Sequence, residues 1–406
     1  MSEPLVLTVL PAPPLNSGAE VRDTIDDVLG IARRAEAAGL EGLFLADSLA
    51  FDPSFSPRNR FEPVSLAAAV LARTERITVV ATLSSTFTHP VHVARHLTSL
   101  SHIGAGRIAA NLVTSYAGEQ NFGLDELPSP AQRYARAGEY LAVVDRLWHS
   151  WGEKGDDPAD IDFTGEHFTV RGPLSIRPFP GPLLVGQSGA SPEGIDLAAR
   201  VAEFVFTSAP ADHAQRRYTD ALTRACATHR IDGTRPTILT GLAPILGDTA
   251  EQAREHERAL AGVFSFAEQR TRIEEVLGGV DLSDVAPDDP FPRDRLPAVE
   301  HIGRRQGRAA AIHELVTQND LTLAEVVRIG NTANGHRSVV GTADTVAAEI
   351  ARIAGTGLTD GFIVLLPKHS ELVDRVFEEL FPRLERAGLL VPAPDADRTR
   401  SRFLRR

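Results

Sequence analysis

Cysteine is almost absent from this sequence, since Cys226 is the single one among 406 residues. One cysteine excludes an internal disulfide, and 43% hydrophobic residues over this length suffice to bury a core without one. Cys226 lies in an alanine-rich run, and we interpret it as an inert packed thiol. No run of about 18 apolar residues occurs, and the first apolar run stops at Pro11 without a basic segment before it. These absences leave secretion and membrane spanning unsupported, and we expect a cytoplasmic protein.

An excess of basic charge is also absent, because 42 Lys and Arg face 54 Asp and Glu, for a net charge of −12. Such a surface repels phosphate backbones, so we expect no nucleic-acid partner. The five arginines of residues 398–406 are interpreted as part of a frayed, solvated tail.

Several catalytic motifs are missing as well. Neither a G-x-G-x-x-G nor a Walker A sequence occurs, so a dinucleotide-binding fold has no direct support. No G-x-S-x-G elbow points to a hydrolase. His89, His92 and His96 lie close together, but no H-E-x-x-H arrangement contains them. A helix start is therefore the favoured interpretation of these histidines over a zinc site.

What the sequence does contain is a regular alternation of short apolar segments with longer amphipathic ones. Eight segments are predicted as strands, at 5–10, 43–46, 77–83, 107–113, 183–186, 204–207, 237–245 and 362–366. The predicted helices span 23–38, 62–73, 90–103, 132–148, 191–201, 212–229, 249–269, 342–354 and 371–387. This α/β alternation predicts parallel strands, and eight of them close a (β/α)8 TIM barrel. An open, doubly wound sheet has the same alternation and stays possible on the strand count.

Two insertions interrupt the alternation within a single domain of residues 1–390, which a tail at 391–406 follows. The first, about 156–182, comes after the fourth helix and contains a hairpin-like segment at 163–170. The second, about 271–340, precedes the last βα unit and contains a predicted helix at 308–316. Long insertions in barrels serve as lids over the catalytic face or as surface excursions, and both interpretations stay open here.

Small polar residues follow four of the predicted strands, where barrel enzymes have their active sites. Their segments are FLAD at 44–47, ATLSST at 81–86, NLVTS at 111–115 and GQSGASPEG at 186–194. Hydroxyl and amide side chains at one rim suit a polar heteroaromatic ligand. In the last segment Ser191 is the expected N-cap of a helix that Pro192 opens, and such a helix start can bind a phosphate.

These segments also resemble luciferase-like flavin monooxygenases, in the branch that contains nitrilotriacetate monooxygenase, dibenzothiophene-sulfone monooxygenase and the pristinamycin synthase subunit. The resemblance runs from about residue 5 to 366 and breaks mainly inside the two insertions. Its further pieces, in order along the chain, are EP at 62–63, TERI at 74–77, HVAR at 92–95, GAGR at 104–107, RYAR at 133–136, FVFT at 204–207 and VGT at 340–342.

The resemblance implies an FMNH2-dependent monooxygenase whose reduced FMN comes from a separate NAD(P)H:flavin reductase. Reduced FMN and O2 would form a flavin (hydro)peroxide, at C4a or N5, that oxygenates a small organic substrate. A homodimer is expected on the same basis, and the substrate itself is not readable. By position, the resemblance assigns Asp47 to the flavin, Thr82 and Asn111 to the catalytic edge where oxygen reacts, Ser85 to the ring or ribityl chain, Tyr134 to the vicinity of the phosphate, and Ala190 and Ser191 to the phosphate itself.

This sequence departs from the family at three of its usual positions. Pro130 and Ser48 stand where relatives commonly have histidine, and Ala190 replaces the first serine of the phosphate loop. These changes concern the details of flavin and substrate contact. Two other functions stay open at this point: hydride transfer with the deazaflavin F420, and flavin binding without catalysis.

Overall fold

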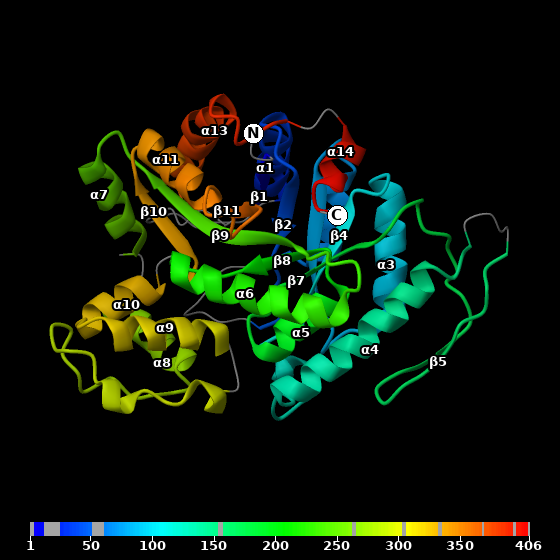
Figure 1. Cartoon of the computed structure of the whole chain (residues 1–406), viewed down its shortest axis with the longest axis horizontal. Helices are drawn as coiled ribbons and strands as arrows, with labels where there is room; N and C mark the ends of the chain where they lie inside the picture. The colour runs from blue at the N-terminus through cyan, green and yellow to red at the C-terminus, as the bar shows by residue number, and fades with distance from the viewer. Residues whose placement is uncertain are drawn as a thin grey trace.

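Eight parallel strands close into a barrel in the computed structural model, which describes residues 4–11, 25–50, 61–152, 157–261, 265–302, 306–331, 335–367, 369–392 and 395–404 (Figure 1). The strands pair in the order β9–β11–β1–β2–β3–β4–β7–β8, and β8 pairs back with β9. This closure confirms the predicted barrel and excludes the open sheet. The barrel strands are β1 (Val6–Leu10), β2 (Gly42–Leu45), β3 (Thr78–Ser84), β4 (Ile108–Val113), β7 (Leu184–Gln187), β8 (Phe204–Thr207), β9 (Thr237–Leu246) and β11 (Gly361–Leu365).

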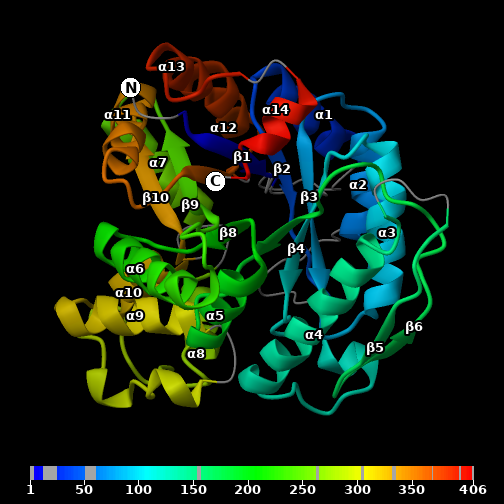
Figure 2. The ribbon, with the colours of Figure 1, turned by 45° about the vertical axis from the view of Figure 1, so that its right-hand side comes forward.

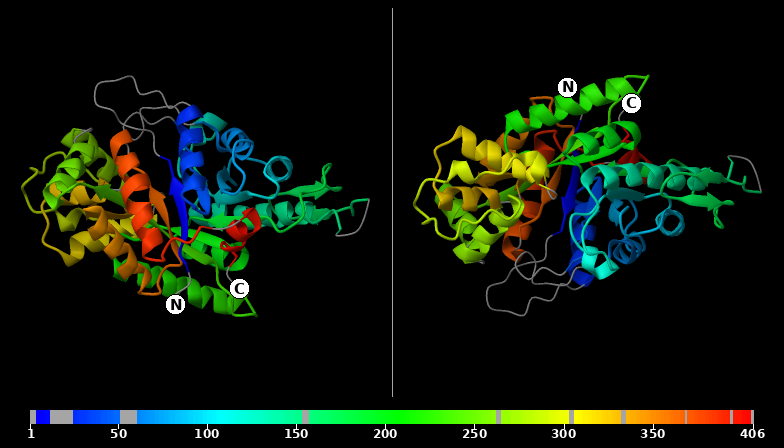
Figure 3. Two further views of the ribbon diagram at one scale, coloured as in Figure 1. Left: turned by 90° about the horizontal axis from the view of Figure 1, so that it is seen from above. Right: turned by 90° about the horizontal axis from the view of Figure 1, so that it is seen from below.

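Helices surround the barrel and bury a large apolar layer against its outer face (Figure 3). Four of them begin with proline at the first helical position, where the missing N–H has no bond to lose. The surrounding elements are α1 (Ile25–Ala37), α2 (Pro63–Leu71), α3 (Pro90–Ile103), α4 (Pro130–Trp148), α5 (Pro192–Val201), α6 (Asp212–His229), α7 (Ala250–Ala261), α11 (Ala343–Ala354), α12 (Ser370–Arg375), the π-helical turn η5 (Val376–Leu380) and α13 (Phe381–Arg386).

The barrel interior is filled by one apolar side chain from each of its eight strands. Because side chains alternate between the two faces of a strand, these positions also fix which later residues face inward. The layer consists of Val6, Phe44, Val80, Ala109, Leu184, Phe204, Leu239 and Ile363, and Phe403 joins it from outside the strands.

The C-terminal residues close the amino-terminal end of the barrel, so the prediction of a frayed tail is wrong for residues 395–404. A short helix, α14 (Ala396–Ser401), precedes Phe403, whose side chain is fully buried and packs on Phe204 with 5.3 Å between ring centroids. The Phe403 carbonyl accepts a 2.9 Å hydrogen bond from Thr237, and Arg402 pairs with the buried Glu41. Burial of Phe403 orders this segment, and Arg400 and Arg402 beside it bond to the Pro182 carbonyl and to Glu41.

A ninth parallel strand, β10 (Arg337–Gly341), was not predicted, since its residues fell inside the predicted second insertion. It pairs only with the far half of β9, with Arg337 opposite Leu242 and Gly341 opposite Leu246. The nearer half of β9 pairs with β8 and β11 within the barrel. Strand β9 is ten residues long and therefore extends beyond the barrel.

The first insertion forms the predicted hairpin, with β5 (Asp162–Thr164) antiparallel to β6 (Thr169–Arg171), and it projects from the body of the molecule (Figure 3). The second insertion has an apolar core of its own, which includes Ile273, Leu282 and Ile312. It lies beside α5 and α6 (Figure 2). Its elements are α8 (Phe266–Val276), the 3-10 turns η2 (Arg293–Arg295) and η3 (Val299–His301), α9 (Gln306–Gln318) and α10 (Leu323–Asn331).

Helix boundaries differ from prediction mainly at 249–269, which was expected as one helix. Two helices, α7 and α8, occupy this region, and Ser265 caps α8 in a reciprocal pair with Glu268. The predicted start of the first helix at Asp23 lies outside the described residues. Among the described helices none is long and apolar enough to cross a membrane.

Candidate active site

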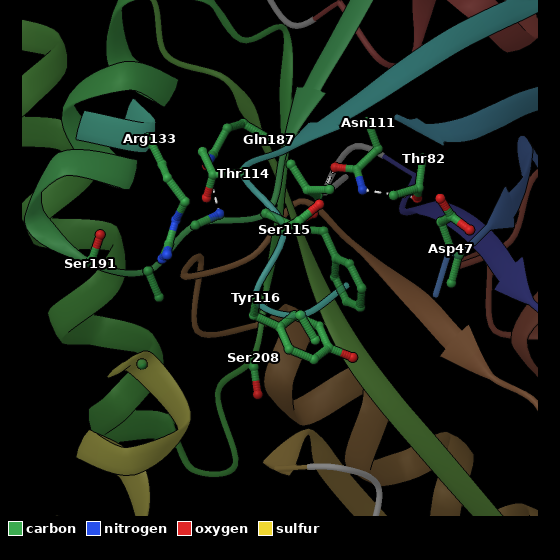
Figure 4. Close-up of a pocket in the computed structure, with 18 of the residues that line it drawn as sticks. Asp47, Thr82, Asn111, Thr114, Ser115, Tyr116, Arg133, Gln187, Ser191 and Ser208 are labelled. Atoms are coloured by element: carbon green, nitrogen blue, oxygen red, sulfur yellow. Dashed lines mark hydrogen bonds between the residues drawn. The ribbon is translucent and has the colours of Figure 1, made fainter. Parts of the chain in front are cut away.

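A cavity of about 380 Å³ lies at the carboxyl ends of β2, β3, β4, β7 and β8, the size range of a small-molecule site. Apolar side chains from β2 and β8, Phe44 and Phe206, line part of it. Figure 4 shows its two ends, with Arg133 and Ser191 at one and Asp47, Thr82 and Asn111 at the other. Its polar lining comprises Asp47, Ser48, Thr82, Asn111, Thr114, Ser115, Tyr116, Arg133, Tyr134, Gln187, Ser188, Ser191, Ser208 and Arg308.

One end of the cavity is the start of helix α5, where the first backbone N–H groups have no acceptor within the helix itself. Ser191 is the N-cap of α5, its hydroxyl accepts a 3.2 Å hydrogen bond from Gly194 N, and Pro192 follows at the first helical position. A side chain at Gly189 would collide with the Tyr134 hydroxyl, so the glycine lets this hydroxyl approach the loop. Arg133, nearly buried, adds a positive charge to the same end. Helix donors and a guanidinium together favour an anion.

The other end carries a chain of three hydrogen-bonded side chains from three strand ends. Ser188 Oγ lies 2.7 Å from Asn111 Oδ1, and Asn111 Nδ2 lies 3.1 Å from Thr82 Oγ1. Thr82 pairs with Asn111 across β3 and β4, and Asn111 pairs with Gly186 across β4 and β7. Thr82 and Asn111 are nearly buried, at 6% and 2% exposed. These three side chains therefore offer uncharged donors and acceptors in a setting with little water, beside the Asp47 carboxylate.

The loop after β4 forms a further wall and is held by hydroxyls of the β3 end. Ser84 Oγ lies 2.7 Å from Ser115 Oγ, and Thr86 Oγ1 donates to Thr114 O at 2.6 Å. Ser115 has a φ of 49°, a left-handed conformation that is uncommon for residues other than glycine. The two hydroxyl contacts hold Thr114 and Ser115 at the cavity wall despite this conformation.

The second insertion reaches the cavity through Gly307 and Arg308 at the start of α9. A Cβ at Gly307 would lie 3.0 Å from the Ala190 Cβ, so α9 packs directly on the loop after β7. Arg308 donates to Gly330 O at 2.9 Å. Nearby, His336 stacks on Phe206 with 5.0 Å between centroids, and burial with the Arg308 charge lowers the pKa of His336 to about 4. The imidazole is therefore neutral at physiological pH.

Six of the seven residues that the sequence predicted for the site line this cavity, and the structure brings them together: Asp47, Thr82, Asn111, Tyr134, Ala190 and Ser191. Ser85 does not line it. Its side chain is fully buried, and its hydroxyl donates to Val113 O at 3.1 Å. Pro130 and Ser48, the positions that depart from the family, lie in the lining as well.

Sequence reasoning did not single out several residues of the site. Ser188 lies inside a predicted segment, and two-residue alternation from the inward-facing Leu184 would have found it. Arg133 lies beside the predicted Tyr134. Gly307 and Arg308 had no such signal, because their place at the cavity depends on how the insertion packs.

Comparison with known proteins settles the family. The sequence model of the luciferase-like monooxygenase family matches residues 5–360. The chain belongs to this family. It is 30% identical to N-acetyl-S-(2-succino)cysteine monooxygenase of Bacillus subtilis (strain 168), covering 88% of this chain and 85% of that one. It is 31% identical to nitrilotriacetate monooxygenase component A of Aminobacter aminovorans, with the same coverage of 88% and 85%.

Two further relatives confirm the predicted branch, each 32% identical: dibenzothiophene-sulfone monooxygenase of Rhodococcus erythropolis and a pristinamycin IIA synthase subunit of Streptomyces pristinaespiralis. In structure, EDTA monooxygenase from Chelativorans sp. BNC1 superposes with a TM-score of 0.77 at 24% identity, covering 99% of this luciferase-like chain and 98% of that one. An F420-dependent secondary alcohol dehydrogenase shares the fold less closely, with a TM-score of 0.64 at 15% identity. Three of these relatives, at 30–32% identity, are monooxygenases, so this luciferase-like protein is an oxidoreductase of the monooxygenase type. The comparisons favour this activity over F420-dependent hydride transfer.

Proposed function

We propose that this chain is the oxygenating component of a two-component system. A separate NAD(P)H:flavin reductase supplies reduced FMN, and the chain uses it with O2 to place one oxygen atom on a small organic substrate while the other leaves as water. The observation that carries this proposal is that one cavity joins the start of helix α5 to the polar edge of Thr82 and Asn111. FMN has the two matching ends, a phosphate and a polar heteroaromatic ring.

The residues of the cavity fit FMN at both ends. Ala190 and Ser191 at the α5 start would hold the phosphate with backbone donors, together with the Tyr134 hydroxyl and the Arg133 charge. Asp47, Thr82 and Asn111 would meet the ring at the other end. Ser85 is left out, because its hydroxyl is already bound to a backbone carbonyl of the next strand.

Bound reduced FMN would supply the two electrons that oxygen activation requires. The protein's own residues orient the ring, offer hydrogen bonds at its edge and exclude water. For this last task we propose the second insertion, 271–340, as the lid, since α9 packs on the loop that carries Ala190 and gives Arg308 to the cavity wall.

The test compares FMN with riboflavin, which lacks the phosphate. The protein should bind both saturably in an anaerobic titration in their reduced forms, and FMN more tightly. Arg133→Gln should weaken FMN binding by about tenfold, the cost of a lost charge-assisted bond, and leave riboflavin unchanged. Arg200→Gln, an arginine on α5 that does not line the cavity, is the matched control. No saturable binding of reduced FMN by the unaltered protein would refute the proposal.

The reaction itself is tested by adding a flavin reductase with NAD(P)H and following O2. Because free reduced FMN also reacts with O2, mixtures with and without this protein are compared: slower release of hydrogen peroxide in its presence supports the oxygenase, whereas hydride transfer from reduced F420 to an organic acceptor without O2 would favour the alternative. We also propose that the protein is cytoplasmic and forms a homodimer. Light scattering on the purified protein measures its oligomeric state.

A further inference from the structure

We infer that Ser188 is a positioning residue that fixes the Asn111 amide, so that Thr82 presents its hydroxyl proton to the cavity. The three side chains form one chain of hydrogen bonds across the ends of β7, β4 and β3, and all three line the cavity. The inference rests on the proposed function, because the group that would receive the proton is the flavin edge or the oxygen bound beside it.

The lengths of the two contacts identify the donor in each. The 2.7 Å between Ser188 Oγ and Asn111 Oδ1 is the usual length of an O–H···O bond. The 3.1 Å between Asn111 Nδ2 and Thr82 Oγ1 fits an N–H···O bond and is long for an O–H···O bond. Ser188 therefore donates to Asn111, and Asn111 donates to Thr82.

This direction decides what Thr82 can do. Its oxygen accepts from Asn111, so its single proton must point elsewhere, and it has no other hydrogen bond with the described residues. Thr82 lies in the cavity lining and is 6% exposed. The proton is therefore available to a ligand in a place where few waters compete, and hydrogen bonds count for more there.

Without Ser188 the amide loses the donor that holds its oxygen in place. An asparagine amide presents an oxygen on one side and an NH2 group on the other, so rotation by half a turn exchanges them. In the rotated state Asn111 Oδ1 faces Thr82, whose hydroxyl then donates to the amide and is lost to the ligand. A serine hydroxyl can also accept, so Ser188 selects the orientation through distance: in the rotated state the NH2 group would face Ser188 Oγ at 2.7 Å, short for an N–H···O bond, and the oxygen would face Thr82 Oγ1 at 3.1 Å, long for an O–H···O bond. Ser188 thus acts on the flavin edge through the choice between two amide orientations.

A double-mutant cycle tests the inference, with Ser188→Ala, Thr82→Val and the double variant. Each protein is loaded with oxidised FMN, and its visible spectrum is recorded. It is then mixed as the reduced FMN complex with O2, and hydrogen peroxide release is timed.

Both single variants should share a shifted flavin spectrum and release peroxide about tenfold faster, the value of one lost hydrogen bond. The double variant should resemble Thr82→Val alone, because the two residues act in series. All three variants should still bind FMN saturably, because the phosphate end of the cavity is unaltered, and Ser188→Thr should behave like the unaltered protein.

The outcomes separate this inference from the proposed function. Absence of FMN binding by the unaltered protein refutes both. Normal binding with a Ser188→Ala variant that matches the unaltered protein in spectrum and peroxide release overturns the Ser188 role alone. Additive effects in the double variant also overturn it, as does a loss of thermal stability with no spectral change. Ser188→Cys, close in size and a weak donor, repeats the test if the alanine variant does not fold.

Discussion

At the scale of single residues, Asn111 is the side chain on which the polar end of the cavity depends, because it bonds to both Ser188 and Thr82. Asn111→Leu keeps a similar size and removes both contacts. We expect this variant to bind reduced FMN, because the phosphate end of the cavity is unaltered, but to release hydrogen peroxide faster after mixing with O2. The measurement is the rate of peroxide release from the preloaded complex. Release as slow as in the unaltered protein would refute the assignment, and Asn319→Leu, an exposed position on the insertion, is the control.

Glu203 makes the stability of the protein depend on pH, as does Glu41, whose pKa burial also raises to about 7. Burial raises the pKa of Glu203 to about 7 from 4.5, although Val185 N donates to its carboxylate at 2.7 Å. Between these two pH values the folded state holds a proton that the unfolded state has released, so the free energy of unfolding falls as pH rises, by roughly 3 kcal/mol at most.

Glu203→Gln should therefore reduce the fall in stability between pH 4.5 and 7 and leave the part that Glu41 contributes, since the amide oxygen still accepts from Val185. Urea unfolding at several pH values measures this directly. Glu251→Gln, an exposed residue on α7, should leave the slope unchanged. An identical slope in Glu203→Gln and the unaltered protein would contradict the expected burial effect.

The residues of the site show what sequence can and cannot supply at this scale. Parallel strands deliver their carboxyl ends to one rim, which pointed to the segments that contain Thr82 and Asn111, and the resemblance to the family then singled out these two residues. The prediction that Ser85 contacts the flavin is not supported by strand alternation. Val80 and Thr82 face the barrel interior, so alternation turns Ser84 inward and Ser85 outward. The position of Arg308 at the cavity could not be predicted, because no periodicity in the sequence indicates which part of an insertion packs over the barrel.

At the scale of elements, the α9 helix of the insertion is tied to α6 by an ion pair. Arg217 bonds to both carboxylate oxygens of Glu314, and His213 lies 3.1 Å from the same group. Arg217 is more than half exposed, so the pair contributes less than about 1 kcal/mol to stability. We expect its role to be local: it joins α9 of the insertion to α6, beside the cavity.

Arg217→Gln should therefore leave the melting temperature nearly unchanged while increasing hydrogen exchange along α9 and peroxide leakage. Exchange measured by mass spectrometry on peptides of the insertion checks the first effect. Arg224→Gln, on the same helix α6, is the comparison. Unaltered exchange in α9 would show that other contacts hold the insertion.

Elements were predictable where they are long and periodic, and less so where pairing decides them. Strand β10 is five residues long and exists because β9 extends past the barrel and offers an edge. The division of 249–269 into two helices follows from the cap at Ser265, a local signal that the continuous helical pattern concealed.

At the scale of the whole molecule, Phe403 closes the end of the barrel opposite the cavity. Its side chain is fully buried against Phe204. Phe403→Ala should lower the free energy of unfolding by about 3–5 kcal/mol, as expected for a large core side chain. Ile231→Ala, at a fully exposed position, should have no effect. FMN affinity measured below the melting transition should persist, since the site lies at the other mouth.

The parallel pairing of β1 with β11 joins residues 6–10 to residues 361–365. In a nascent chain synthesised only up to β9, the barrel is not yet closed. The edges of β1 and β9 then lack their partner β11 and can pair with strands of other chains. Contacts this distant along the sequence also slow spontaneous refolding from denaturant. During synthesis the protein is therefore prone to aggregation until β11 is complete, and chaperone binding would protect it in this period.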